Sequence, residues 1–107
     1  MFKHRSNGRV FVISIDGVPY NFMQQQMAQG RFPNFKRLTQ HGSLRRMNSV
    51  HPCLSSVAWS SYMTGKNPAQ HNIFGFVERK AGSYDLFMPT SRDMRGVTIW
   101  EIMSAAG

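Results

Sequence analysis

Apolar and polar positions divide the chain into an opening apolar run and several short segments with helical spacing. Residues 10–15 (VFVISI) form an apolar run that stops at Asp16. Such a run predicts a strand covered on both faces, which is typical of the centre of a parallel sheet. The segment 52–65 (PCLSSVAWSSYMTG) instead places Ser55 and Ser56 just before an apolar stretch with helical spacing. The pattern therefore predicts an α/β protein.

Three helices are expected from the apolar spacing and from the residues that flank it. The first runs from Pro19 to about Gln29 and stops at Gly30, and the second covers 33–41 and ends at Gly42. The third covers 55–64, with Gly65 as its C-cap. The residues expected to pack in this third helix are Ala58, Trp59, Tyr62 and Met63.

Weaker signals surround these helices. Residues 44–50 suggest an extended segment, and 74–87 suggest an excursion with short strands. Thr98 and Glu101 form the T-x-x-E pattern of a capping box before a last apolar helix, which stops at Gly107. In a βαβ pattern a parallel strand would follow, so we expect residues 1–107 to be the N-terminal part of one larger α/β domain.

Composition narrows the possible partners. With 13 Lys and Arg against 5 Asp and Glu, the 107 residues carry a formal charge of +8, which favours an anionic partner. The basic residues are scattered, so a solvated surface is favoured over a nucleic-acid patch. The lone Cys53 excludes an internal disulfide and suggests a small buried side chain. No signal peptide or membrane span is expected, which predicts a cytoplasmic protein.

The residues that could carry chemistry each have a structural interpretation too. A carboxylate at the end of a strand, such as Asp16, suits zinc, manganese or magnesium, but Asp-Gly is also a common tight turn. Ser55 or Ser56 could be a nucleophile beside the positive end of a helix, or simply its N-cap. Four residues lack the spacing of metal ligands and are expected to be structural: His4, His41, His51 and His71.

The combination of these segments is more specific than its parts. VISIDGV, GRFPNFKRLTQHG and HPCLSSVAWSSYMTGKNPAQHNIFGF follow one another in order, and TIWEIMSAAG closes the chain. Together they resemble the N-terminal third of the type I phosphodiesterase/nucleotide pyrophosphatase family of the alkaline phosphatase superfamily. The resemblance implies an α/β/α sandwich around a mostly parallel sheet, with two divalent metal ions at the strand ends, often zinc. Manganese and magnesium remain open.

The resemblance also implies roles for individual residues. Asp16 matches the family's first metal ligand, and Ser55 matches its nucleophile, which is also a metal ligand. The Ser55 oxygen would attack the phosphorus of a small-molecule phosphate ester and form a covalent phospho-enzyme, which water would hydrolyse with metal assistance. The N–H of Ser56 would contact a phosphate oxygen.

Three departures from the family pattern affect these implications. Ala58 stands where many nucleotide pyrophosphatases have a phosphate-binding Asn, which leaves nucleotide preference open. Asn72 stands where Gly is usual, but Asn tolerates the left-handed conformation that the turn requires. The remaining metal ligands, spaced D-x-x-x-H and D-H, would lie beyond Gly107. We therefore expect the 107 residues alone to be catalytically inactive.

Two other functions stay open from the sequence. A haloacid dehalogenase-like phosphatase has a first strand that ends D-x-D-G, but Ser14 occupies the position of its nucleophile. That interpretation also leaves the serine-rich helix unexplained. A non-catalytic basic module that binds polyanions would instead show affinity that falls steeply with salt and does not depend on divalent metal.

Overall fold

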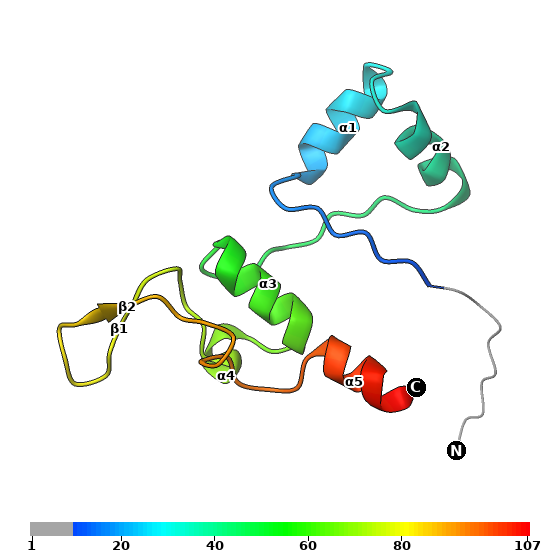
Figure 1. Ribbon diagram of the computed structural model, residues 1–107. Coiled ribbons are helices and arrows are strands. Elements are labelled where there is room, and N and C mark those ends of the chain that lie inside the picture. The colour runs from blue at the N-terminus through cyan, green and yellow to red at the C-terminus, as the bar shows by residue number, and fades with distance from the viewer. Residues whose placement is uncertain (1–9) are drawn as a thin grey trace. The chain divides into compact units, whose positions relative to one another are not determined.

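The structure is a computed structural model that describes residues 10–107 (Figure 1). Its element order is α1, α2, α3, α4, β1, β2, α5. The chain divides after Arg46 into two compact units, which are described separately. No helix within residues 10–107 combines the length and the apolar character needed to cross a membrane.

The first unit contains a pair of helices, α1 (Tyr20–Ala28) and α2 (Pro33–His41). Both match the prediction closely, with Pro19 as the N-cap of α1 and Gly42 as the C-cap of α2. Gly30 has a φ of +74°, a value that favours glycine, and its N–H donates to the carbonyl of Met27 at 3.2 Å. The turn between the helices is therefore encoded locally. Aromatic rings pack across it in two pairs, Phe22 with Phe32 and Phe32 with Phe35.

The predicted central strand at residues 10–15 is wrong for the described part of the chain. No strand is assigned there, and the apolar side chains are exposed, with Val10 86% and Ile13 85% accessible. A β-strand exists only through hydrogen bonds to a neighbouring strand, and the one sheet within residues 10–107 lies elsewhere. The apolar composition alone therefore does not make a strand here. Residues 44–50 likewise have no regular structure.

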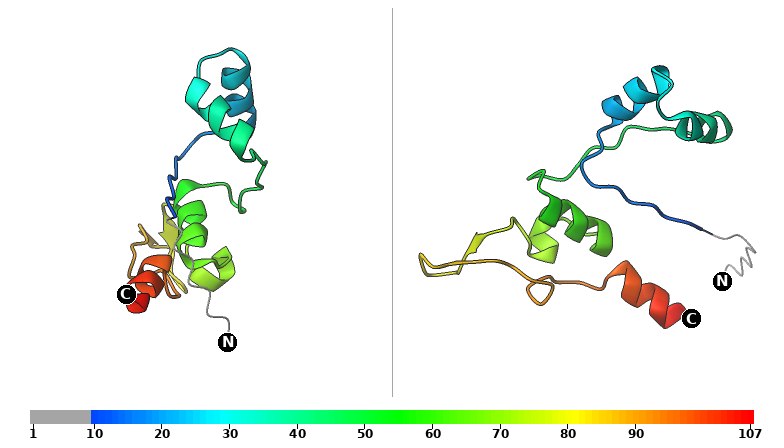
Figure 2. Two further views of the ribbon diagram at one scale, coloured as in Figure 1. Left: turned by 90° about the vertical axis from the view of Figure 1, so that its right-hand side faces the viewer. Right: turned by 45° about the horizontal axis from the view of Figure 1, so that its top comes forward.

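The second unit contains α3 (Ser55–Thr64), α4 (Pro68–His71) and α5 (Ile99–Ala106). Helix α3 contacts both α4 and α5, and the two views of Figure 2 show α4 beside α3. Strands β1 (Glu78–Arg79) and β2 (Leu86–Phe87) form an antiparallel hairpin. Both lie in the segment 74–87, for which the sequence predicted short strands. In Figure 1 this hairpin extends away from the helices. A mixed α and β composition is thus present, but the parallel sheet expected from the sequence is absent from residues 10–107.

Local capping fixes the helix ends of this unit. Gly65 adopts the left-handed conformation at the end of α3, and its N–H donates to the Ser61 carbonyl at 2.8 Å. At the start of α5, Thr98 and Glu101 make both hydrogen bonds of the capping box, as predicted. The Glu101 carboxylate accepts hydrogen bonds from the N–H and from the hydroxyl of Thr98. These two bonds, the first more than the second, lower the pKa of the carboxyl. Asn67 and Gln70 form a second capping box before α4.

The packed face of α3 differs from the predicted one. The buried residues of this helix are Val57 and Ser60, whereas Tyr62 is 43% exposed and stacks edge-on against Trp59. Residue size therefore failed as a guide to burial in this helix. The face that is covered is set by the segments that pack on it, which contribute the buried residues His71 and Ile73.

Candidate functional site

Asp16 lies in a turn of the first unit. Asp16 and Gly17 are the two turn residues, Asp16 is exposed, and Gly17 has a φ of +69°. The Asp-Gly turn, one of the two interpretations left open by the sequence, is therefore present. A turn does not exclude a ligand role, because the Asp16 side chain is exposed and a carboxylate is a hard oxygen ligand.

Ser55 and Ser56 are the first two residues of α3, in the second unit. The N-cap is Leu54, and no side chain caps the helix, so the interpretation of either serine as the N-cap is wrong. The first helical turn includes N–H groups that have no acceptor within the helix. Together with the helix dipole, such groups favour an anion beside them.

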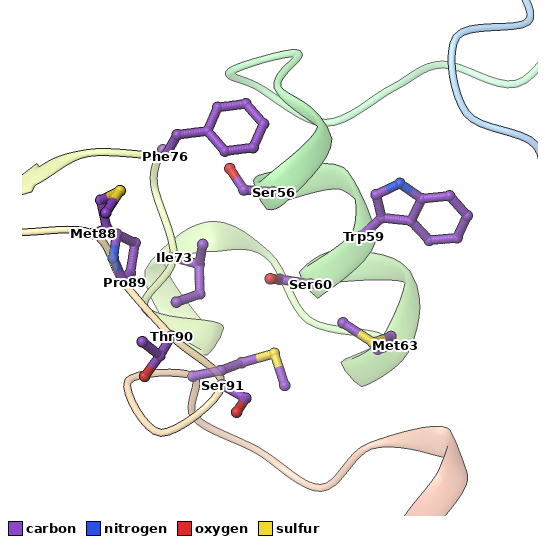
Figure 3. Close-up of a pocket in the computed structure, with 12 residues that line it drawn as sticks. Ser56, Trp59, Ser60, Met63, Ile73, Phe76, Met88, Pro89, Thr90 and Ser91 are labelled. Atoms are coloured by element: carbon purple, nitrogen blue, oxygen red, sulfur yellow. The ribbon is translucent and has the colours of Figure 1, made fainter.

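The hydroxyl oxygen of Ser56 is buried and has no hydrogen-bond partner within residues 10–107. It lies at a pocket of about 420 Å³ in the second unit, between α3 and two loop segments (Figure 3). The first segment includes Ile73, Gly75 and Phe76, and the second runs from Met88 to Met94. A buried hydroxyl without a partner is unfavourable, so this atom is a candidate contact for a ligand.

A carboxylate holds the first wall of the pocket in place. One carboxyl oxygen of Glu78 accepts hydrogen bonds from the N–H of Phe74 at 2.7 Å and of Gly75 at 3.3 Å. Gly75 is buried, and a side chain there would press on the carbonyl of Val77 at 3.3 Å. Phe76 follows directly, and Figure 3 shows its ring on the side of the pocket nearest Ser56.

Hydrogen bonds between distant segments hold the second wall. The Asn72 side chain donates to the carbonyl of Asp93 at 3.2 Å, and the N–H of Arg95 donates to the carbonyl of His71 at 2.9 Å. The Asp93 carboxylate accepts from both the N–H and the hydroxyl of Thr90, and these bonds lower its pKa. Segment 88–95 is thereby tied to the end of α4.

His71 is structural, as predicted. The residue is fully buried, its Nδ1 accepts from the N–H of Ile73 at 3.1 Å, and its Nε2 lies 2.9 Å from the Ser61 hydroxyl. Since Nδ1 is an acceptor, the proton of the neutral ring is on Nε2 and is donated to Ser61. Burial lowers the pKa of this imidazole below its ordinary value. With Nε2 protonated, His71 cannot act as a base toward Ser61.

The other residues singled out from the sequence are exposed or lie outside the described residues. Cys53 is exposed rather than buried, and its thiol donates to the carbonyl of Val50 at 3.2 Å. His41 and His51 are exposed, and His4 lies outside the described residues. Within residues 10–107, no three His, Cys, Asp or Glu side chains form a group that could hold a metal ion.

Comparison with known families identifies the chain. Residues 10–107 match the family described as type I phosphodiesterase / nucleotide pyrophosphatase, which covers every residue that the structure describes. The chain belongs to this family. Membership of the type I phosphodiesterase family confirms the predicted resemblance and gives the chain a class, that of phosphodiesterase and nucleotide pyrophosphatase enzymes. No solved structure matches the chain.

The sequence and the structure of this type I phosphodiesterase family member differ in what they reveal of the site. The sequence singled out Asp16, Ser55 and Ser56, which belong to the two separately described units. It did not single out the pocket walls at 73–76 and 88–94. The only available signal was the cluster of apolar residues Ile73, Phe74 and Phe76 after α4, which by itself also fits an ordinary core segment.

Proposed function

We propose that this chain contributes the nucleophile and a metal ligand to a hydrolase of small-molecule phosphate esters, with Ser55 as the nucleophile. The observation that carries this proposal is the position of Ser55 as the first residue of α3, after an N-cap that has no side-chain hydrogen bond. The first-turn N–H groups can then stabilise a phosphate oxygen. Membership of the type I phosphodiesterase family supplies the reaction class.

The reaction proceeds in two displacements at phosphorus. The Ser55 oxygen attacks phosphorus and forms a P–O bond, while the bond from phosphorus to the leaving oxygen breaks. The Ser55 proton passes to solvent, and the leaving oxygen takes up a proton from solvent to depart as an alcohol. Water then attacks the phosphoserine, and the Ser55–phosphorus bond breaks to release phosphate or a monoester. The N–H of Ser56 donates to a non-bridging phosphate oxygen throughout.

The donor types fit a divalent cation in part. Asp16 offers an exposed carboxylate and Ser55 a hydroxyl, both hard oxygen donors suited to zinc, manganese or magnesium. Two such ions, when bound, would supply positive charge to the attacking oxygen and to the phosphate. Asp16 and Ser55 are too few to hold them, and residues 10–107 offer no three-ligand group. We therefore propose that other ligands are required and that residues 1–107 alone do not hydrolyse phosphate esters.

The test begins with the coding sequence after Gly107. The product of the whole reading frame is then assayed for hydrolysis of a chromogenic phosphodiester with zinc, manganese or magnesium. Hydrolysis that Ser55→Ala abolishes supports the proposal. Hydrolysis that is indifferent to Ser55→Ala supports a haloacid dehalogenase-like mechanism instead. A stop codon after Gly107 together with no hydrolysis contradicts the proposal and favours binding of polyanions.

A further inference from the structure

Three successive backbone N–H groups after α4 are held by side chains. The N–H of Ile73 donates to Nδ1 of His71 at 3.1 Å. The N–H groups of Phe74 and Gly75 both donate to one carboxyl oxygen of Glu78, at 2.7 and 3.3 Å. Residues 72–77 belong to no helix or strand, so the loop has no ladder of its own to bind these groups. Because backbone N–H groups need an acceptor, the His71 and Glu78 side chains determine the path of the loop.

Glu78 belongs to a different element from the loop that it holds. It is the first residue of β1, where it lies opposite Phe87 of β2, and it is half-buried. Hydrogen bonds to a carboxylate are shorter and stronger than those between neutral groups, in keeping with the 2.7 Å bond from Phe74. Glu78 therefore fastens the loop to the β1–β2 hairpin.

The loop held in this way lies against the residue that precedes α3. A Cβ atom at Gly75 would lie 3.9 Å from Cδ1 of Leu54, which is an ordinary van der Waals distance. Leu54 is the N-cap of α3, and its carbonyl accepts the first hydrogen bond of the helix, from the N–H of Ala58 at 2.9 Å. Ser55 follows Leu54 directly. The position of Gly75 therefore acts on the residue next to the proposed nucleophile.

From these contacts we infer that Glu78 is a positioning residue, whose carboxylate holds Gly75 against Leu54 and so fixes the backbone at Ser55. Glu78 acts through these two residues and not on the reacting atoms. Its effect on catalysis rests on the proposed function of Ser55, whereas its effect on the start of α3 does not. A misplacement of about 1 Å at a reacting group can lower a rate about a hundredfold, so such a restraint matters for turnover.

The first test compares Glu78→Ala with Glu78→Gln in the product of the whole reading frame, with a chromogenic phosphodiester as substrate. Ala removes both hydrogen bonds to the loop, whereas Gln keeps the length of the side chain and an acceptor oxygen. We expect Glu78→Ala to lower kcat about ten- to hundredfold and to leave KM within about twofold of the parent, because Glu78 orients the nucleophile and does not bind substrate. Glu78→Gln should recover most of the lost kcat.

Glu101→Ala is the matched control for a loss of stability. The Glu101 carboxylate also accepts two hydrogen bonds, but they come from the N–H and the hydroxyl of Thr98 at the start of α5. Loss of either pair of bonds should lower the urea midpoint. We expect kcat to fall only in Glu78→Ala, because only that variant releases the loop beside Leu54.

A double-mutant cycle and NMR spectra test the path through Leu54. Leu54→Ala removes the side chain that Gly75 approaches, so the fold-loss of kcat in Glu78→Ala combined with Leu54→Ala should be smaller than the product of the two single losses. In NMR spectra, which need no hydrolysis, Glu78→Gln should shift the amide resonances of Phe74 and Gly75 and also that of Ser55. Glu101→Ala should leave the Ser55 amide unchanged.

Three results would overturn the inference. They are a parental kcat in Glu78→Ala, equal losses of kcat in Glu78→Ala and Glu101→Ala, and a Ser55 amide that stays in place while those of Phe74 and Gly75 shift. Failure of the proposed function is seen separately, as hydrolysis that is absent or indifferent to Ser55→Ala. In that case the shift of the Ser55 amide in Glu78→Gln decides whether Glu78 fixes the start of α3.

Discussion

Ser61 and His71 are joined by a 2.9 Å hydrogen bond that links α3 to the last residue of α4. The imidazole donates from Nε2, because its Nδ1 is occupied by the N–H of Ile73 at 3.1 Å. A protonated ring would place a second N–H against that of Ile73. The neutral ring is therefore part of the packing of the second unit.

This arrangement predicts that stability falls at acidic pH. Burial lowers the pKa of His71 below 6.5, so the unfolded chain binds the proton more tightly than the folded chain. The contribution is complete above about pH 6.5 and is lost as the pH falls below it. We expect the free energy of unfolding to decrease from pH 7.5 to pH 5, by up to about 1.4 kcal/mol per pH unit for one proton. The urea midpoint should fall with it.

The measurement combines unfolding with a direct titration of the ring. His71→Gln should flatten the pH dependence, whereas His51→Gln, at an exposed position, should preserve it. If the variant does not fold, NMR titration of the parent still decides the matter. A His71 pKa at or above 6.5 would contradict the prediction.

Asn72 occupies a backbone position that excludes most residues. Its φ is +66°, and its side chain donates to the Asp93 carbonyl at 3.2 Å. Asn72→Ala should destabilise the chain by about 1–2 kcal/mol, since it removes the hydrogen bond and replaces a residue that tolerates the left-handed conformation by one that does not. Asn72→Gly removes the same bond without the strain and should cost less. Urea unfolding of both variants is the measurement, and an equal cost would show that the conformation is irrelevant.

Local signals in the sequence were sufficient for the presence of α1, α2, α3 and α5 and for most of their ends, whereas the short helix α4 (Pro68–His71) was not predicted. Gly30, Gly42 and Gly65 end helices, and Thr98 with Glu101 begins one, because these residues act on backbone groups within a few positions. The same reasoning failed for residues 10–15. A strand depends on a neighbouring strand, and no local pattern supplies one.

The candidate site was predictable only in its residue types. Asp16 and Ser55 were identified from their places in ordered motifs, but a motif carries no distance between segments. The pocket beside Ser56 depends on contacts between residues far apart in the chain, such as that of Asn72 with Asp93. Helical periodicity does not encode such contacts, and it also missed the burial of Ser60.

Replacement of the proposed nucleophile is expected to abolish turnover in the product of the whole reading frame. Ser55→Ala should lower kcat by at least about a thousandfold, because no other group takes over the covalent step. Ser55→Thr keeps a hydroxyl at the first position of α3 and should retain part of the activity. Hydrolysis rates with a chromogenic phosphodiester are the measurement. Equal activity in the parent and in Ser55→Ala would reject Ser55 as the nucleophile.

Hydrolysis is expected to depend on divalent metal, with Asp16 as one of the metal ligands. A chelator is expected to abolish hydrolysis by the same product, and added zinc, manganese or magnesium should restore it. Asp16→Asn keeps the size of the side chain but removes its charge, so the variant should need at least about tenfold more metal for half-maximal activity. Asp85→Asn, at an exposed position in the β1–β2 loop, is the matched control and should respond to metal as the parent does. If Asp16→Asn and Asp85→Asn titrate alike, Asp16 is not a ligand and its carboxylate serves only the turn with Gly17.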